Sequence, residues 1–230
     1  MKFRIGILFI CVMLAVSVTG CGLKRRNLEE KKRDELEDII DELEDEKEEM
    51  EEESEELDEL KEDAAKTALP YPLELHFSSG AGAWSSSIVI ESDGSFSGNY
   101  HDTDMGVVGE EYPNGTVYEC NFKGKFKSVR QVNEYTYLFV MDSIRTERKP
   151  DEVRVVDGVR YVSTSPAGMM SEEGTKPAKE FWLYTPEAPI EKLSEEFLTW
   201  WPRRMEKDEL AQLSMYGLCN TETEEGFFAE

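Results

Sequence analysis

The sequence is poor in the residue types on which catalytic and metal sites most often depend. Its 230 residues include four cysteines and two histidines, His76 and His101. It has neither a glycine-rich phosphate loop after a predicted strand nor a Gly-x-Ser-x-Gly nucleophile elbow. Acidic residues are numerous, but spacing selects no carboxylate pair for hydrolysis. We therefore expect no catalytic residue and no cofactor.

Residues 28–66 contain no glycine, proline or aromatic residue. Such a composition is typical of a helix or of a disordered acidic tract. Between Lys24 and Lys66 there are 9 basic and 22 acidic residues, so like charges crowd together. Apolar residues recur every seven positions, at Leu36, Leu43, Met50, Leu57 and Ala64. A coiled coil needs a second apolar position in each seven-residue repeat, and charged residues occupy some of these second positions. We therefore predict a long acidic helical stalk over residues 28–69 that forms at most a weak coiled coil.

The N-terminus begins with a positive charge and continues as an apolar run from Ile5 to Gly20. The run is shorter than the roughly 20 residues that a membrane-spanning helix needs, and it ends in small residues, as a secretory signal does. It meets Cys21 in "VTGC", which resembles the lipobox of bacterial lipoproteins. The resemblance implies a signal peptide over residues 1–20 and lipidation of Cys21. An ordinary signal peptide and a retained membrane helix are the alternatives.

The lipobox resemblance implies a protein held to the cell membrane by its lipid and facing the extracellular or envelope side. Residues 21–27 would then be the lipid anchor and a basic juxtamembrane segment. Basic residues next to an acyl chain can each add roughly 1 kcal/mol of attraction to anionic headgroups. A basic first turn of a solvated helix explains the same residues equally well.

Residues 70–230 have a different composition. All nine prolines and 22 of the 24 aromatic residues lie in residues 67–230, a segment long enough to form its own core. Alternating segments predict β-strands, with hairpin turns at Asp93-Gly94 and Asp157-Gly158 and a pair of strands bent at Gly124. From Pro189 onward, apolar residues recur at the spacing of one face of a helix. We predict a mainly β fold, an antiparallel barrel or sandwich, with one C-terminal helix.

The run "FSSGAGAWSSSIVIESDGSFSGNYHDTDMG", followed by "YPNGTVYECNFKGKF", resembles a domain of uncharacterised Gram-positive surface lipoproteins. The strand order of that domain is similar to that of small lipocalin-like barrels. No functional residue carries over from it. Because lipocalin-like barrels hold small apolar ligands in the barrel mouth, the resemblance implies a binding role, by analogy of fold alone.

The loop "HDTDMGVVGEEYPNG", residues 101–115, gathers four carboxylates, those of Asp102, Asp104, Glu110 and Glu111. Its first two aspartates fit the first and third positions of a calcium-binding loop, but Gly106, Val107 and Pro113 break the later spacing. A looser oxygen cage remains as a metal hypothesis, whereas His101 has no second zinc ligand at a suitable spacing. We favour a polar loop built by turn residues, at a barrel rim where a ligand would enter.

Cys120 and Cys219 are the cysteines of the predicted β domain. A disulfide between them is permitted outside the membrane, and two buried free thiols are the alternative. The tryptophans suggest either a ligand-stacking platform or core positions. We expect core positions, with Trp200 or Trp201 as the more exposed member, because adjacent helical residues do not share a face.

A stripe of lysines, Lys123, Lys125 and Lys127, alternates with Phe122 and Phe126 and predicts a strand with one basic face. That face would meet an anionic polymer or the acidic surface of the domain itself. The formal net charge of −24 makes nucleic acid an unsuitable partner.

Two functional hypotheses follow from the sequence. The first is a membrane-anchored surface lipoprotein whose β domain binds a small molecule, a glycan or a protein without catalysis. The second is a structural envelope protein that self-associates through its stalk and has no ligand pocket.

Overall fold

The computed structural model describes Lys47, residues 69–80 and residues 82–229. The predicted signal peptide, Cys21, the basic segment and almost all of the stalk lie outside the described residues. Within them, no helix is both long and apolar enough to cross a membrane. Leu69, which we assigned to the stalk, is buried in the core of the β domain. The domain therefore includes at least one residue more than predicted.

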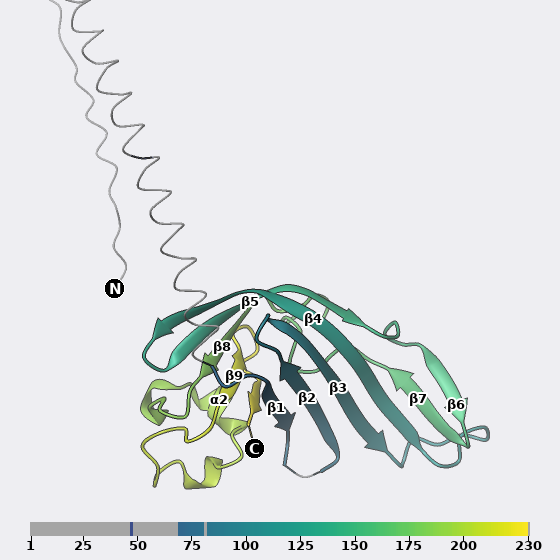
Figure 1. The fold of residues 1–230 in the computed structure, drawn as a ribbon. Coiled ribbons are helices and arrows are strands. Elements are labelled where there is room, and N and C mark those ends of the chain that lie inside the picture. The colour runs from purple at the N-terminus through teal and green to yellow at the C-terminus, as the bar shows by residue number, and fades with distance from the viewer. Residues whose placement is uncertain (1–46, 48–68, 81, 230) are drawn as a thin grey trace, which may run out of the picture. The chain divides into compact units, whose positions relative to one another are not determined.

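Eight antiparallel strands form a closed barrel (Figure 1). Around the barrel they follow the order β3, β2, β1, β10, β9, β8, β5 and β4, and β4 pairs with β3 to close it. Their bounds are β1 Leu73–Ser78, β2 Trp84–Ile90, β3 Ser95–Asp104, β4 Thr116–Asn133, β5 Thr136–Thr146, β8 Glu180–Tyr184, β9 Gly217–Asn220 and β10 Gly226–Phe228. The mainly β fold is thus confirmed as a barrel rather than a sandwich.

The strands of the barrel are strongly staggered. Following directly opposed residues around the barrel from Asn121 on β4 leads back to the same strand at Asn133, 12 residues further along. A barrel closes with such a stagger only when its strands tilt against the barrel axis. With eight strands, the interior is just wide enough for side chains to fill or for one small ligand.

A further hairpin, β6 Val153–Val156 and β7 Val159–Ser163, extends the sheet beyond the barrel. β7 runs parallel to the first residues of β4, next to the place where β5 pairs with the rest of that strand. Its two-residue turn has positive φ at Asp157 (52°) and Gly158 (75°), as such hairpins require. The predicted turn at this position is confirmed.

Two predicted elements are wrong. Residues 116–133 form one strand, β4, rather than a pair bent at Gly124, and its bends are the register shifts after Lys125. The predicted C-terminal helix is divided into the 3-10 helix Ile190–Lys192 (η1), the short α2 Glu195–Thr199 and the 3-10 helix Arg204–Glu206 (η2). Ser194 causes the first break because it is extended (ψ 150°) and its side chain accepts a hydrogen bond from the backbone N–H of Phe197.

Side chains fill the barrel interior. Every one of the eight strands contributes to one buried cluster, whose fully buried members include Leu75, Phe139, Phe181 and Phe227. Three hollows, of about 530, 550 and 490 Å³, lie outside the barrel. The interior therefore differs from the open mouth that the lipocalin-like resemblance implied.

The connection between β7 and β8, residues 164–179, closes the interior. Met169 is fully buried in the barrel cluster. Two polar side chains hold this connection in place. The Ser86 hydroxyl donates a hydrogen bond to the carbonyl of Ala167 (3.1 Å). The side-chain amide of Asn220 donates to the carbonyls of Gly168 (3.1 Å) and Met170 (2.8 Å). We name residues 164–179 the plug.

A second apolar cluster covers the outside of β8, β9 and β10. It contains Phe197, Trp201 and Leu213 from the C-terminal segment, together with Cys219 and Phe228 from the strands. Because β9 is buried on both faces, its sequence "GLCN" lacks the alternation of a half-exposed strand, and it was not predicted.

Replacing Asn220 with alanine is expected to destabilise the protein by about 1–3 kcal/mol, because one buried and one partly buried carbonyl of the plug lose their donor. The matched change Asn99→Ala removes an exposed side chain with one side-chain hydrogen bond and should cost less than about 0.5 kcal/mol. Urea unfolding of the full chain measures both values. Equal effects would contradict the pinning role of Asn220.

Candidate functional site

The predicted rim loop is held by its own turns. Asp102 and Asp104 are among the last three residues of β3. The side chain of Asp104 accepts a hydrogen bond from the backbone N–H of Gly106 (2.8 Å). Glu110 and Glu111 are exposed. Among the described residues, no group of three or more His, Cys, Asp or Glu side chains is arranged to hold a metal ion. The four carboxylates are therefore not brought together.

The same loop is also tied to the β6–β7 hairpin. The backbone N–H of Asn114 donates to the carbonyl of Gly158 (2.9 Å), and its side-chain amide donates to that of Asp157 (3.0 Å). The hydroxyl of Thr116 donates to the carbonyl of Val107 (2.8 Å). His101 is exposed, as expected for the outer side of β3, and its ring nitrogen lies 3.2 Å from the hydroxyl of Thr103.

Cys120 and Cys219 are both free and buried, so the structure contains no disulfide between them. Cys120 belongs to the barrel cluster and Cys219 to the second cluster, on opposite faces of the sheet. Burial raises the pKa of Cys120 to about 11 and the pKa of Cys219 to about 12. Both thiols are therefore protonated at neutral pH and unsuited to nucleophilic chemistry.

The tryptophans form no exposed platform. Trp201 is fully buried and Trp200 is half-buried, with its ring 4.9 Å from that of Phe77. The exposed member is Trp182, at 44%, so the expectation for Trp200 or Trp201 was wrong. Trp182 points outward from β8 because the neighbouring positions, Phe181 and Leu183, point into the barrel.

The feature with the geometry of a binding site lies on the outer face of β2, β3, β4 and β5. A hollow of about 530 Å³ and a second of about 550 Å³ share Ser97, Lys123 and Arg145 among their lining residues. We name this continuous surface the outer groove. Its outward-facing polar lining includes Ser87, Ser97, Asn99, Lys123, Lys125 and Arg145.

Two phenylalanine–glycine pairs lie directly behind the outer groove. Phe96 opposes Gly124 and Phe122 opposes Gly98 across β3 and β4. A Cβ atom on Gly98 would lie 2.4 Å from the Phe122 ring, and one on Gly124 would lie 2.4 Å from the Phe96 ring. The rings therefore occupy the interior space that side chains at these positions would need, and all four residues contribute to the floor of the groove.

Two cations in the outer groove lie side by side, and neither forms an ion pair within the described residues. Lys123 is directly opposite Arg145 in the β4–β5 register, which places their Cβ atoms about 5 Å apart. Among the described residues, neither side chain forms an ion pair or a hydrogen bond. Like charges at opposed positions destabilise a strand pair, so this arrangement has a cost in the unliganded protein.

Lys125 is a third cation on the same face, roughly 7 Å from Lys123 along β4. Its acidic neighbour is Asp93, which is fully exposed. The pKa of Asp93 is lowered chiefly by hydrogen bonds from Ser95 and, to a smaller extent, by Lys125. Lys127 is exposed beyond the groove. The predicted basic strand face is therefore present.

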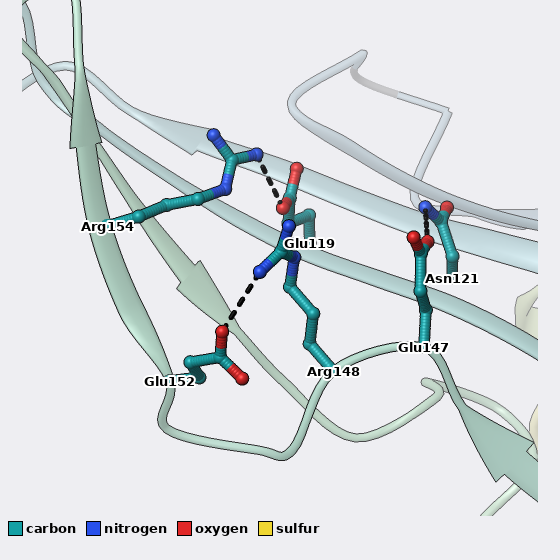
Figure 2. A network of polar contacts seen from close by, with 6 residues as sticks. All are labelled: Glu119, Asn121, Glu147, Arg148, Glu152 and Arg154. Carbon is teal, nitrogen blue, oxygen red and sulfur yellow. Dashed lines mark hydrogen bonds and ion pairs between the residues drawn. The ribbon is translucent and has the colours of Figure 1, made fainter.

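Three acidic side chains around the groove have partners of their own (Figure 2). The carboxylate of Glu119 accepts from Arg154 (2.8 Å), that of Glu152 accepts from Arg148 (2.9 Å), and that of Glu147 accepts from the side-chain amide of Asn121 (2.8 Å). Glu147 lines only the first hollow and Glu91 only the second, whereas Lys123 and Arg145 line both. The shared centre of the groove is therefore cationic.

The sequence showed part of this site. The alternation of lysine with phenylalanine identified Lys123 and Lys125. Arg145 was missed because it joins them through the β4–β5 register, which three register shifts make unreadable from local pattern. The contributions of Ser87, Ser97 and Asn99 depend on the β2–β3–β4 pairing in the same way.

Comparison with known proteins gives no relative for this chain: no family model, no curated protein and no solved structure matches it. The lipobox and lipocalin-like resemblances seen in the sequence stay predictions. The candidate site consists of the geometry and charge of the outer groove.

Proposed function

We propose that this chain is a lipid-anchored envelope protein whose barrel binds a ligand on its outer face, without catalysis. The observation that carries the proposal is the filled interior. Phe139, Phe181 and Phe227 are fully buried inside the barrel, and Met169 of the plug is buried with them. A small barrel with such an interior has no room for the apolar ligand that open lipocalin-like barrels hold.

The outer groove supports the binding role. It joins two hollows of about 530 and 550 Å³, a size that suits small ligands or a short stretch of a polymer. Its walls are side chains on paired strands of the barrel, so the groove is formed before a ligand arrives. The sequence supports the anchor through the apolar run that ends at "VTGC" and Cys21.

A structural role is the second candidate, and the filled interior favours it as well. In that case the stalk would associate weakly with a second copy, and the barrel would act as a scaffold. Sedimentation of the full chain over a range of concentrations separates the two functions, because a scaffold shows a concentration-dependent dimer and no ligand.

Replacing Cys21 with serine is expected to abolish the lipid anchor, because the thioether to the lipid needs the cysteine sulfur. In a bacterial host that processes lipoproteins, the wild-type chain should partition with the membranes and carry acyl mass on its N-terminal peptide. The Cys21→Ser chain should show neither property. The control is Cys11→Ser, which should leave both unchanged because Cys11 lies in the predicted signal peptide. Membrane retention of Cys21→Ser without a lipid would overturn the anchor.

A further inference from the structure

We propose that the outer groove binds an anionic glycan chain. This inference rests on the outer-face function proposed above and adds the chemical class of the ligand. The first argument is electrostatic. The chain has a net charge of −24, yet Lys123 and Arg145 lie opposite each other with no acidic partner among the described residues. An anionic ligand between them would supply the missing counter-charge.

The second argument concerns the acidic side chains that could have neutralised this pair. Glu119 accepts from Arg154 of β6, Glu152 accepts from Arg148 in the connection between β5 and β6, and Glu147 accepts from Asn121 (Figure 2). Glu147 and Glu91 line the groove, but neither forms an ion pair with Arg145 or Lys123. The cations at the centre of the groove thus stay open to solvent and to a ligand.

The third argument concerns the neutral lining. Ser87, Ser97 and Asn99 lie on the same outer face as Lys123, on strands that pair with one another. Their hydroxyl and amide groups can donate to and accept from sugar hydroxyls, whereas the cations bind acidic substituents. An arginine adds the bidentate geometry that suits a carboxylate.

The fourth argument separates a glycan from an acidic peptide. The groove lies on the face of β2, β3, β4 and β5. Beneath it, β2, β3 and β4 pair with a neighbouring strand on both sides, whereas β5 pairs with β8 only as far as Val140. An extended peptide lying over β2, β3 and β4 therefore finds no free backbone edge to which it could add as a strand, and a peptide added to β5 beyond Val140 would lie at the border of the groove. Recognition has to come from side chains, and the groove offers hydroxyls, amides and cations.

The test is titration of the full chain with oligomers of polygalacturonate, a carboxylate glycan, and with neutral dextran of the same length. The wild-type protein should bind polygalacturonate and not dextran. The double variant Lys123→Glu/Arg145→Glu should lose at least about tenfold in affinity. The control double variant, Arg130→Glu/Lys176→Glu, changes two exposed residues outside the groove, has the same net charge, and should stay within about twofold.

A third variant excludes unfolding as the cause of lost binding. Lys123→Glu alone turns a repulsive pair with Arg145 into an attractive one, so its melting temperature should not fall while its affinity for polygalacturonate does. Equal losses in both double variants would overturn the inference. Binding of dextran that is lost in the Lys123→Glu/Arg145→Glu variant would overturn the inference that the ligand is anionic, although it would still support binding on the outer face. An apolar molecule inside the wild-type barrel would overturn the proposed function itself.

Discussion

Replacing Gly124 with alanine is expected to lower the free energy of unfolding by about 4 kcal/mol, a large part of the stability of an ordinary domain. A Cβ atom at this position would lie 2.1 Å from the backbone carbonyl oxygen of Ser143 and 2.4 Å from the ring of Phe96. The carbonyl belongs to the neighbouring strand β5, so relief of the clash has to open the β4–β5 pairing. The change should also distort the outer groove, because Gly124 is part of its floor.

The matched control for Gly124 is Gly106→Ala. A Cβ atom there meets the end of the Asp104 side chain at 3.2 Å, and that side chain can move. Its expected cost is within about 0.5 kcal/mol. Chemical unfolding followed by circular dichroism measures both variants. A cost of less than about 1 kcal/mol for Gly124→Ala would mean that the phenylalanine–glycine pairs do not shape the sheet.

Replacing Phe139 with alanine is expected to cost about 3–5 kcal/mol, because the ring is fully buried at the centre of the filled barrel. Its centroid lies 5.2 Å from that of Phe126, in an edge-to-face arrangement. The variant should also gain an apolar cavity that takes up a small aromatic probe such as benzene. The wild-type barrel should take up none, since buried side chains occupy its interior.

The control for Phe139 is Trp182→Ala on the outer face of β8. Trp182 is larger than Phe139 but 44% exposed, and its removal should cost about 1 kcal/mol or less. Differential scanning calorimetry with and without the probe gives both the stability and the binding. Stoichiometric uptake of the probe by the wild-type protein would contradict the filled interior.

The sequence predicted the strands in which apolar and polar residues alternate. The hairpins at Asp93-Gly94 and Asp157-Gly158 were visible because turn residues separate two alternating runs. β9 was not, since it is buried on both faces and has no alternation. The filling of the barrel was also hidden, because Met169 enters the interior from a connection whose sequence has no regular pattern.

The site was less predictable than the fold because it depends on register. A stripe such as Lys123 and Lys125 shows that one strand face is basic, but not which residues lie opposite. The pairing of Lys123 with Arg145 follows register shifts in β4 that no local pattern reports. The loop with Asp102 and Asp104 drew attention for the opposite reason. Its residue types raised a metal hypothesis, but they favoured a polar loop built by turn residues, and the hydrogen bond from the Gly106 N–H to Asp104 forms such a turn.

Lysine footprinting of the full chain tests the outer-face account most directly. The protein is acetylated briefly with and without saturating polygalacturonate, and the modified lysines are quantified by mass spectrometry. The account predicts that Lys123 and Lys125 lose most of their reactivity, while the exposed Lys149 and Lys176 keep theirs. Unchanged reactivity of Lys123 and Lys125, or equal protection of all four lysines, would contradict it.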